Sequence, residues 1–441
     1  MRIDVHAHYW TDDYLDLLVD LGKADARAAR GLGASGGAEL EARLRLMDRA
    51  GVEMQVLSTC PQSPYGEDAG KAARAARFVN DEYAELVQRH RDRFRAFAAL
   101  PMPHPDESIS EMRRALGQLR MAGVAMNTTV LGRALVDPDY EPVFAELDTR
   151  GAVLYLHPAG NSACSPLIGN YHLTWMVGAP VEDTISVMHL ITHGIPARYP
   201  NIKIINSHLG GALPMLLQRA DDQYRWEAPD TPERPSVAAR RMWYDTVGHG
   251  HVPALRCAID SLGADRLLLG TDFPYENGDI FVRAVDYIND PQVDTIAARA
   301  ILDENANALF GIGQERQETA SSPVRTGDPP SNPASLASTD RDVPSAVREM
   351  AHGTADQLLR LPRVRQLIAG SPHLPFLGRS RAQSADLGPA ASRLSRPSPS
   401  TATAGLLGTG FNTGGLLAQP TVPAVLARNS PGREPTWALT R

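Results

Sequence analysis

Short apolar, β-branched runs alternate with longer amphipathic stretches over the first 312 residues. Runs typical of buried strands occur at residues 3–5, 52–58, 96–102, 123–126, 152–156, 202–207, 242–247 and 267–270. Helix-like stretches between them include residues 40–50, 70–90, 108–122 and 138–150. This alternation is typical of βαβ units, in which helices join parallel strands. Eight such units predict an α/β fold, a (β/α)8 TIM barrel over residues 1–312. A doubly wound sheet is the alternative, but no GxGxxG motif follows the first run.

The composition changes after residue 312. Ser, Pro, Ala, Gly and Arg dominate residues 313–441, and the only aromatic residues there are Phe376, Phe411 and Trp437. Such a segment buries too little apolar surface to offset its chain entropy. We therefore expect a low-complexity, disordered tail over residues 313–441.

Charge and cysteine content narrow the classes of function. The formal net charge of −7 argues against a nucleic-acid-binding protein, which needs a basic face. The three cysteines are widely spaced and form neither a disulfide framework nor a CxxC metal site. No apolar run reaches the length of about 18 residues that a membrane span needs, and the N-terminus has no apolar leader. We expect a cytoplasmic protein without membrane or nucleic-acid partners.

Ligand-type side chains stand at the carboxyl ends of the predicted strands. His6 and His8 follow the first run, and their spacing places both imidazoles on one face of a strand. His157 ends the fifth run, His208 the sixth and Asp272 the eighth. In a TIM barrel these ends converge on one mouth. Imidazoles and a carboxylate together suit a divalent transition metal, with Zn²⁺ as the first expectation and Mn²⁺ as the alternative.

Several motifs in order resemble the metal-dependent amidohydrolase superfamily, in the branch that includes aminocarboxymuconate-semialdehyde decarboxylase. They are IDVHAH, ARLRLMDRAGVEMQVLST, YLHP, WMVGAPVEDT, RYPNIKIINSHLGGALPMLLQR and GTDFPY. The resemblance covers roughly residues 1–312. It implies a TIM barrel with one divalent metal ion and a small-molecule carboxylate substrate.

The resemblance also implies a role for individual residues. The metal ligands would be His6, His8, His157 and Asp272. His208 would be the catalytic residue, with Asp272 assisting from the metal. Arg43, Trp175 and Arg219 would bind the substrate, and Arg219 would reach the site of a second subunit, which predicts a homodimer.

A missing lysine indicates a single metal ion. Many binuclear members of the superfamily bridge two metals with a carbamylated lysine on the fourth strand. Here the fourth run reads GVAMN, and no lysine lies between Lys71 and Lys203.

Among the remaining polar residues, Glu182 and Asp183 are expected to begin a helix. His249 is expected in a loop near the mouth.

The leading hypothesis is a metal-dependent, non-oxidative decarboxylase of a small unsaturated or aromatic carboxylic acid. A hydrolase of amides, esters or lactones, or a hydratase, would use the same ligands. A hypothesis of another class is a non-catalytic metal-binding barrel. Buried, unpaired His and Asp side chains would destabilise such a barrel without an ion.

Overall fold

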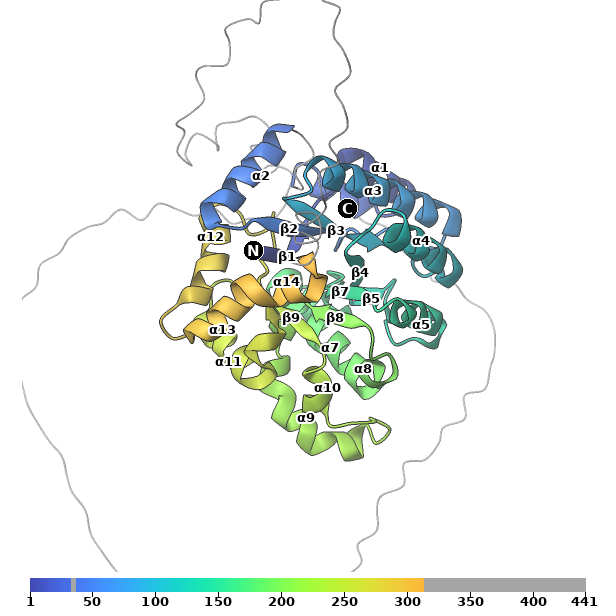
Figure 1. The fold of residues 1–441 in the computed structure, drawn as a ribbon. Coiled ribbons are helices and arrows are strands. Elements are labelled where there is room, and N and C mark those ends of the chain that lie inside the picture. The colour runs from blue at the N-terminus through green and yellow to red at the C-terminus, as the bar shows by residue number, and fades with distance from the viewer. Residues whose placement is uncertain (33–36, 313–441) are drawn as a thin grey trace, which may run out of the picture. The chain divides into compact units, whose positions relative to one another are not determined.

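Eight parallel strands enclose a barrel, and helices surround it (Figure 1). The structure, a computed structural model, describes residues 1–32 and 37–312, so the tail predicted for residues 313–441 lies outside the described residues. The strands follow the order β1-β2-β3-β4-β7-β8-β9-β10. Their bounds are β1 Ile3–His8, β2 Met54–Ser58, β3 Phe94–Ala99, β4 Gly123–Asn127, β7 Val153–His157, β8 Lys203–Asn206, β9 Trp243–Asp245 and β10 Leu267–Leu268. The predicted (β/α)8 barrel is confirmed.

The helices lie where the amphipathic stretches predict them, with ends displaced by a few residues. In α3, for example, buried Ala72, Val79 and Tyr83 share one face, and the Asp68 side chain caps the first turn by accepting a hydrogen bond from the Lys71 N–H. The helices are α1 Asp12–Asp20, α2 Gly37–Ala50, α3 Ala69–Arg89, α4 Pro105–Gly117, α5 Glu141–Thr149, α6 Pro166–Gly169, α7 Ala179–Thr192, α8 Ile195–Arg198, α9 Leu213–Glu227, α10 Pro235–Ala239, α11 Val252–Leu262, α12 Asp279–Asp286, α13 Thr295–Arg299 and α14 Asn305–Phe310. A short hairpin, β5 Thr129–Val130 and β6 Arg133–Ala134, follows β4. Within the described ranges, none of these helices combines the length and apolarity that crossing a membrane would need.

Two apolar clusters lie on opposite faces of the strands. The larger one fills the space between the sheet and the surrounding helices. The smaller one fills the barrel interior, with Ile3, Val5 and Tyr155 among its members. Residues Ala306 and Leu309 of α14 also belong to it, so α14 covers the amino end of the barrel (Figure 1).

A bulge in β1 changes which side chains enter the barrel. Asp4 pairs with Gln55 and Ala7 pairs with Leu57, so two residues of β1 lie opposite one residue of β2. Regular alternation from Ile3 and Val5 would turn Ala7 inward and both strand histidines outward. Instead, Ala7 belongs to the outer cluster, while Ile3 and Val5 belong to the interior cluster. The bulge therefore turns His6 and His8 toward the interior.

The barrel closes between β1 and the segment that follows β10. The Val5 N–H donates to the Leu269 carbonyl at 2.8 Å, the Asp272 N–H to the His6 carbonyl at 2.9 Å and the His8 N–H to the Phe273 carbonyl at 2.7 Å. Ala7 and Phe273 form an isolated parallel bridge. This closure brings Asp272 beside the histidines of β1.

Candidate metal centre

Five ligand-type side chains meet at the carboxyl end of the barrel, each in the last residues of a strand or a few residues beyond one. His6 and His8 belong to β1, His157 ends β7, His208 follows β8, and Asp272 follows β10. The backbones of His208 and Asp272 have φ values of 50° and 60°. Residues with side chains rarely adopt this left-handed conformation, and strain of this kind is concentrated at functional sites.

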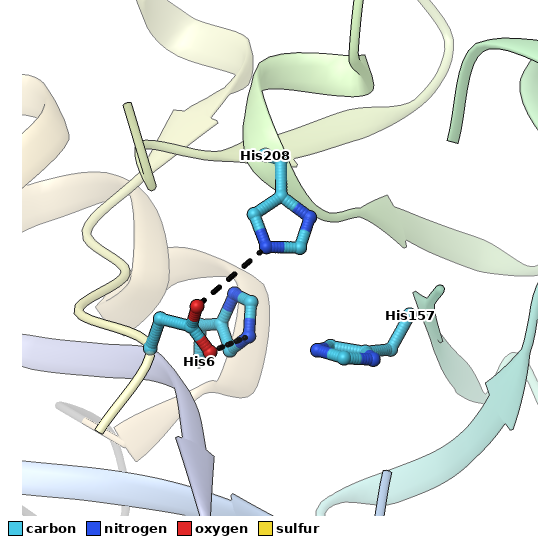
Figure 2. A group of neighbouring side chains, drawn as sticks. His6, His157 and His208 are labelled. Atoms are coloured by element: carbon cyan, nitrogen blue, oxygen red, sulfur yellow. Dashed lines mark ion pairs between the residues drawn. The ribbon is translucent and has the colours of Figure 1, made fainter. Parts of the chain in front are cut away.

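The ligand atoms lie within reach of one ion. One atom each from His6, His157, His208 and Asp272 forms a group whose members are all within 4.8 Å of one another. Figure 2 shows the three imidazoles of this group arranged around a carboxylate. The Oδ1 atom of Asp272 is 3.1 Å from Nε2 of both His6 and His8, and its Oδ2 is 3.8 Å from Nε2 of His208. The predicted ligands His6, His157 and Asp272 belong to this group, together with His208, which was predicted as the catalytic residue. The predicted ligand His8 is not one of its four members, although its Nε2 lies 3.1 Å from Asp272 Oδ1.

Each imidazole is held through Nδ1, which leaves Nε2 for the centre. His6 Nδ1 lies 2.8 Å from an Asp245 carboxylate oxygen, and His208 Nδ1 lies 2.8 Å from one of Asp183. His157 Nδ1 lies 2.9 Å from the carbonyl of Pro158 and His8 Nδ1 lies 3.2 Å from the hydroxyl of Ser58. Histidines that bind metals are commonly oriented by such partners on the other ring nitrogen.

This donor set fits a divalent transition metal. The Nε2 atoms of His6 and His8 are only 3.2 Å apart. Two unprotonated nitrogens at that distance would repel each other, so a proton or a cation must lie between them. Nitrogen ligands together with one carboxylate are the set that Zn²⁺ and similar ions accept.

Burial and neighbouring charges divide the histidines into two kinds. Burial disfavours the charged form of His6, but Asp245 and Asp272 outweigh it and raise its pKa to about 9. Burial lowers the pKa of His8 to about 4 and that of His157 well below its usual value. Burial opposes ionisation of Asp272 as well, but His6 and His208 hold its pKa well below the ordinary range. Protons and a metal ion compete for the same lone pairs, so ion binding would displace protons from this cluster.

The three predicted substrate-binding residues lie in different surroundings. Arg43 on α2 is 1% exposed and donates from Nη1 to the carbonyl of His8 at 2.9 Å. Trp175 is 54% exposed; its ring lies 6.3 Å from that of Tyr275, which in turn lies 5.5 Å from the ring of His8. This chain of rings leads from the surface to the cluster. Arg219 is exposed on α9, outside the cluster.

Sequence reasoning missed the carboxylates that orient the histidines. Asp183 lies in the first turns of α7, as expected, but it also holds His208, which its sequence context did not indicate. Asp245 ends β9, so its position at the carboxyl end of the seventh predicted strand was a usable signal. Near the same mouth, His249 Nδ1 lies 2.5 Å from buried Glu276, a pairing that the sequence did not reveal.

A closed parallel barrel with imidazoles and a carboxylate at its carboxyl ends defines a class, the TIM-barrel enzymes with a candidate metal centre at the mouth. Comparison with known proteins narrows it further. The family model described as Amidohydrolase matches residues 3–312. The chain belongs to the amidohydrolase family.

Several proteins to which the chain is similar are named as decarboxylases. The chain is 30% identical over 246 residues to 2-amino-3-carboxymuconate-6-semialdehyde decarboxylase of Dictyostelium discoideum, covering 54% of this chain and 68% of that protein. It is 32% identical over 295 residues to gamma-resorcylate decarboxylase of Rhizobium radiobacter, covering 62% of this chain and 87% of that protein. A solved dihydroxybenzoic acid decarboxylase from Polaromonas, with bound manganese and 2-nitroresorcinol, matches with a TM-score of 0.61 and 26% identity over 71% of this chain and 97% of that chain.

Proposed function

We propose that the protein is a metal-dependent, non-oxidative decarboxylase of a small unsaturated or aromatic carboxylic acid. The observation that carries this proposal is the convergence of His6, His8, His157, His208 and Asp272 on one point at the mouth of the barrel. The names of the relatives support the choice of decarboxylation over other reactions of the same kind of centre.

One divalent ion would be held by His6, His8, His157 and Asp272. When bound, the ion supplies a Lewis acid that stabilises negative charge developing on the substrate. Zn²⁺ remains the first expectation from the ligand chemistry, and the manganese of the Polaromonas relative is the reason to test Mn²⁺ beside it.

His208 would supply the proton. Cleavage of the bond between the substrate carbon and its carboxylate leaves the electron pair on that carbon, and carbon dioxide departs. A proton from His208 Nε2 would then be transferred to the same carbon, and solvent would restore it to the imidazole. Asp183 would hold the ring through Nδ1, 2.8 Å away, and would stabilise its charged form. Burial disfavours this charged form, but Asp183 and Asp272 outweigh it and keep the pKa of His208 well above its usual value.

Arg43, Trp175 and Arg219 would position the substrate. Arg43 lies on the helix-facing side of β1, where it bonds Gln55 and the carbonyl of His8. Its buried Nη2 has no hydrogen-bond partner among residues 1–32 and 37–312, and its contact with a substrate carboxylate stays a prediction. Trp175 would cover an aromatic or unsaturated ring at the mouth. Arg219 would act on the site of a second subunit.

In a homodimer, Arg219 of one subunit would reach the candidate site of the other. The same helix, α9, exposes Met215 at 79% and Trp226 at 70%. Large apolar side chains exposed together are typical of surfaces that another protein covers. Sedimentation at assay concentration tests this proposal: a dimer is expected, and an active monomer contradicts it.

The experiment for the proposed reaction is an assay of the purified protein loaded with Zn²⁺ or Mn²⁺. It is offered the substrates after which its relatives are named, including 2,6-dihydroxybenzoate and 5-carboxyvanillate, and released carbon dioxide and the decarboxylated product are quantified. Hydrolysis of a lactone and ester panel without carbon dioxide release would favour a hydrolase. A metal-loaded protein inactive on both panels would favour a non-catalytic barrel.

A further inference from the structure

A buried carboxylate lies on the helix-facing side of β1, behind the metal centre. Asp4 is fully buried, and each of its oxygens accepts two hydrogen bonds. Oδ1 accepts from the backbone N–H groups of His6 and Thr271, both at 3.0 Å. Oδ2 accepts from Gln55 Nε2 at 2.7 Å and from the Thr271 hydroxyl at 2.6 Å. Asp4 thus joins β1, β2 and the residue directly before Asp272.

Arg43 extends this set of contacts to α2. Its Nε donates to Gln55 Oε1 at 2.7 Å, and its Nη1 donates to the carbonyl of His8 at 2.9 Å. The ring of Phe273 lies 4.6 Å from the guanidinium carbon. Both histidines of β1 are therefore tied to this group through their backbone, His6 by its N–H and His8 by its carbonyl. We call Asp4, Gln55, Arg43 and Thr271 the bulge network.

The bulge network provides a hydrogen-bond partner for a backbone group that the bulge removes from the ladder. Two residues of β1 oppose one residue of β2 between Asp4 and Ala7, and such a bulge leaves a backbone group without its partner in the ladder. The N–H of His6 is bonded to Asp4 Oδ1 instead. A buried N–H without a partner would favour the regular strand, in which both histidines would turn toward the helices and away from Asp272.

We propose that Asp4, supported by Gln55, Arg43 and Thr271, is a positioning residue that maintains the bulge and thereby aims His6, His8 and Asp272 at one metal ion. The inference rests on the proposed metal centre. The hydrogen bonds described for the bulge network reach the ligands through their backbone or chain neighbours, so its loss should weaken metal binding while the barrel remains folded.

The test is the metal affinity of the full chain, measured for Mn²⁺ and Zn²⁺ by competition with a chromophoric chelator. Asp4→Asn keeps the size of the side chain but places an amide N–H₂ among donors. Thr271→Val removes only the hydroxyl that contacts Asp4. The matched control is Asp221→Asn, because Asp221 accepts from the Ser236 N–H at 2.9 Å and hydroxyl at 2.6 Å, far along the chain in α9. Circular dichroism and thermal unfolding verify the fold of each variant.

We expect Asp4→Asn to weaken metal binding about 100-fold and Thr271→Val about tenfold, the range seen when groups supporting metal ligands are lost. Asp221→Asn should bind metal like the unchanged chain. If Asp4→Asn does not fold, Thr271→Val decides. A folded variant of either kind with unchanged affinity, or an equal loss in Asp221→Asn, overturns the inference, as does an unchanged chain that binds neither metal. Decarboxylation is assayed separately, so an inactive chain that binds metal refutes the proposed reaction while the affinity comparison still stands.

Discussion

The two ends of the barrel differ in almost every physical respect. At the carboxyl end, ionisable side chains are buried against one another, and His208 and Asp272 adopt left-handed backbone conformations. At the amino end, α14 covers the interior with apolar side chains such as Leu309, which is 7% exposed. The carboxyl end therefore contains strained backbone and buried ionisable groups, as functional sites commonly do. The amino end contributes apolar burial that stabilises the fold.

The largest effect expected from this division concerns turnover. Replacing His208 by Ala should lower kcat by about 10²–10⁴-fold, the usual contribution of a general acid, while metal remains bound. Replacing Asp272 or His6 by Ala should remove both metal and turnover. Carbon dioxide release and metal content by mass spectrometry measure the two properties. A His208→Ala variant with near-normal rate contradicts its assignment.

A change at the amino end should lower the stability of the fold and leave turnover unchanged. Leu309→Ala leaves a cavity under α14 and should lower the free energy of unfolding by about 2–5 kcal/mol. Turnover measured well below the unfolding temperature should be unchanged. Chemical denaturation gives the stability, and a parallel loss of kcat would show that the two ends are coupled.

Metal removal sharpens the comparison at the carboxyl end. An ion that binds only the folded chain stabilises it by about 2.7 kcal/mol at a free concentration one hundred times the dissociation constant. Calorimetry with and without a chelator should show this loss, and added Zn²⁺ or Mn²⁺ should reverse it. For the Leu309→Ala variant, removing the ion should lower the free energy of unfolding by the same amount as for the unchanged chain. An unfolding temperature independent of the ion would argue against the metal centre.

The smallest expected effect is a change in KM on replacing Trp175, at the mouth of the barrel. Trp175→Ala removes the ring that contacts Tyr275 and should raise KM by up to about tenfold, since an aromatic contact contributes about 0.5–1.5 kcal/mol. The value of kcat should stay nearly constant. Ile296→Ala, on the exposed face of α13 at 78% exposure, is the control. A kcat that falls while KM is unchanged would mean that Trp175 acts on the reaction step.

The strand ends explain why so much of this site could be predicted. Once alternating runs indicated a parallel barrel, His157, His208 and Asp272 had to meet, because each lies at the carboxyl end of a different strand or shortly beyond it. The orientation of β1 was harder. The spacing of His6 and His8 places them on one face, but regular alternation would put Ile3 and Val5 in the interior and both histidines outside it. The bulge that turns the histidines inward is supported by contacts of Asp4 with Gln55 and Thr271, which are distant in the sequence. Asp183 was likewise hidden, because helix packing brings it to His208.

The closure of the barrel has a consequence for biosynthesis. The candidate centre combines residues 6 and 8 with residue 272. Backbone hydrogen bonds and the contacts of Asp4 with Thr271 join the first strand to the segment that carries residue 272. A nascent chain cannot bring the residues of the candidate centre together until nearly all of the barrel has left the ribosome. The ion would then bind after the domain has been translated. Once bound, it would stabilise the contact between the first and last strands of the barrel.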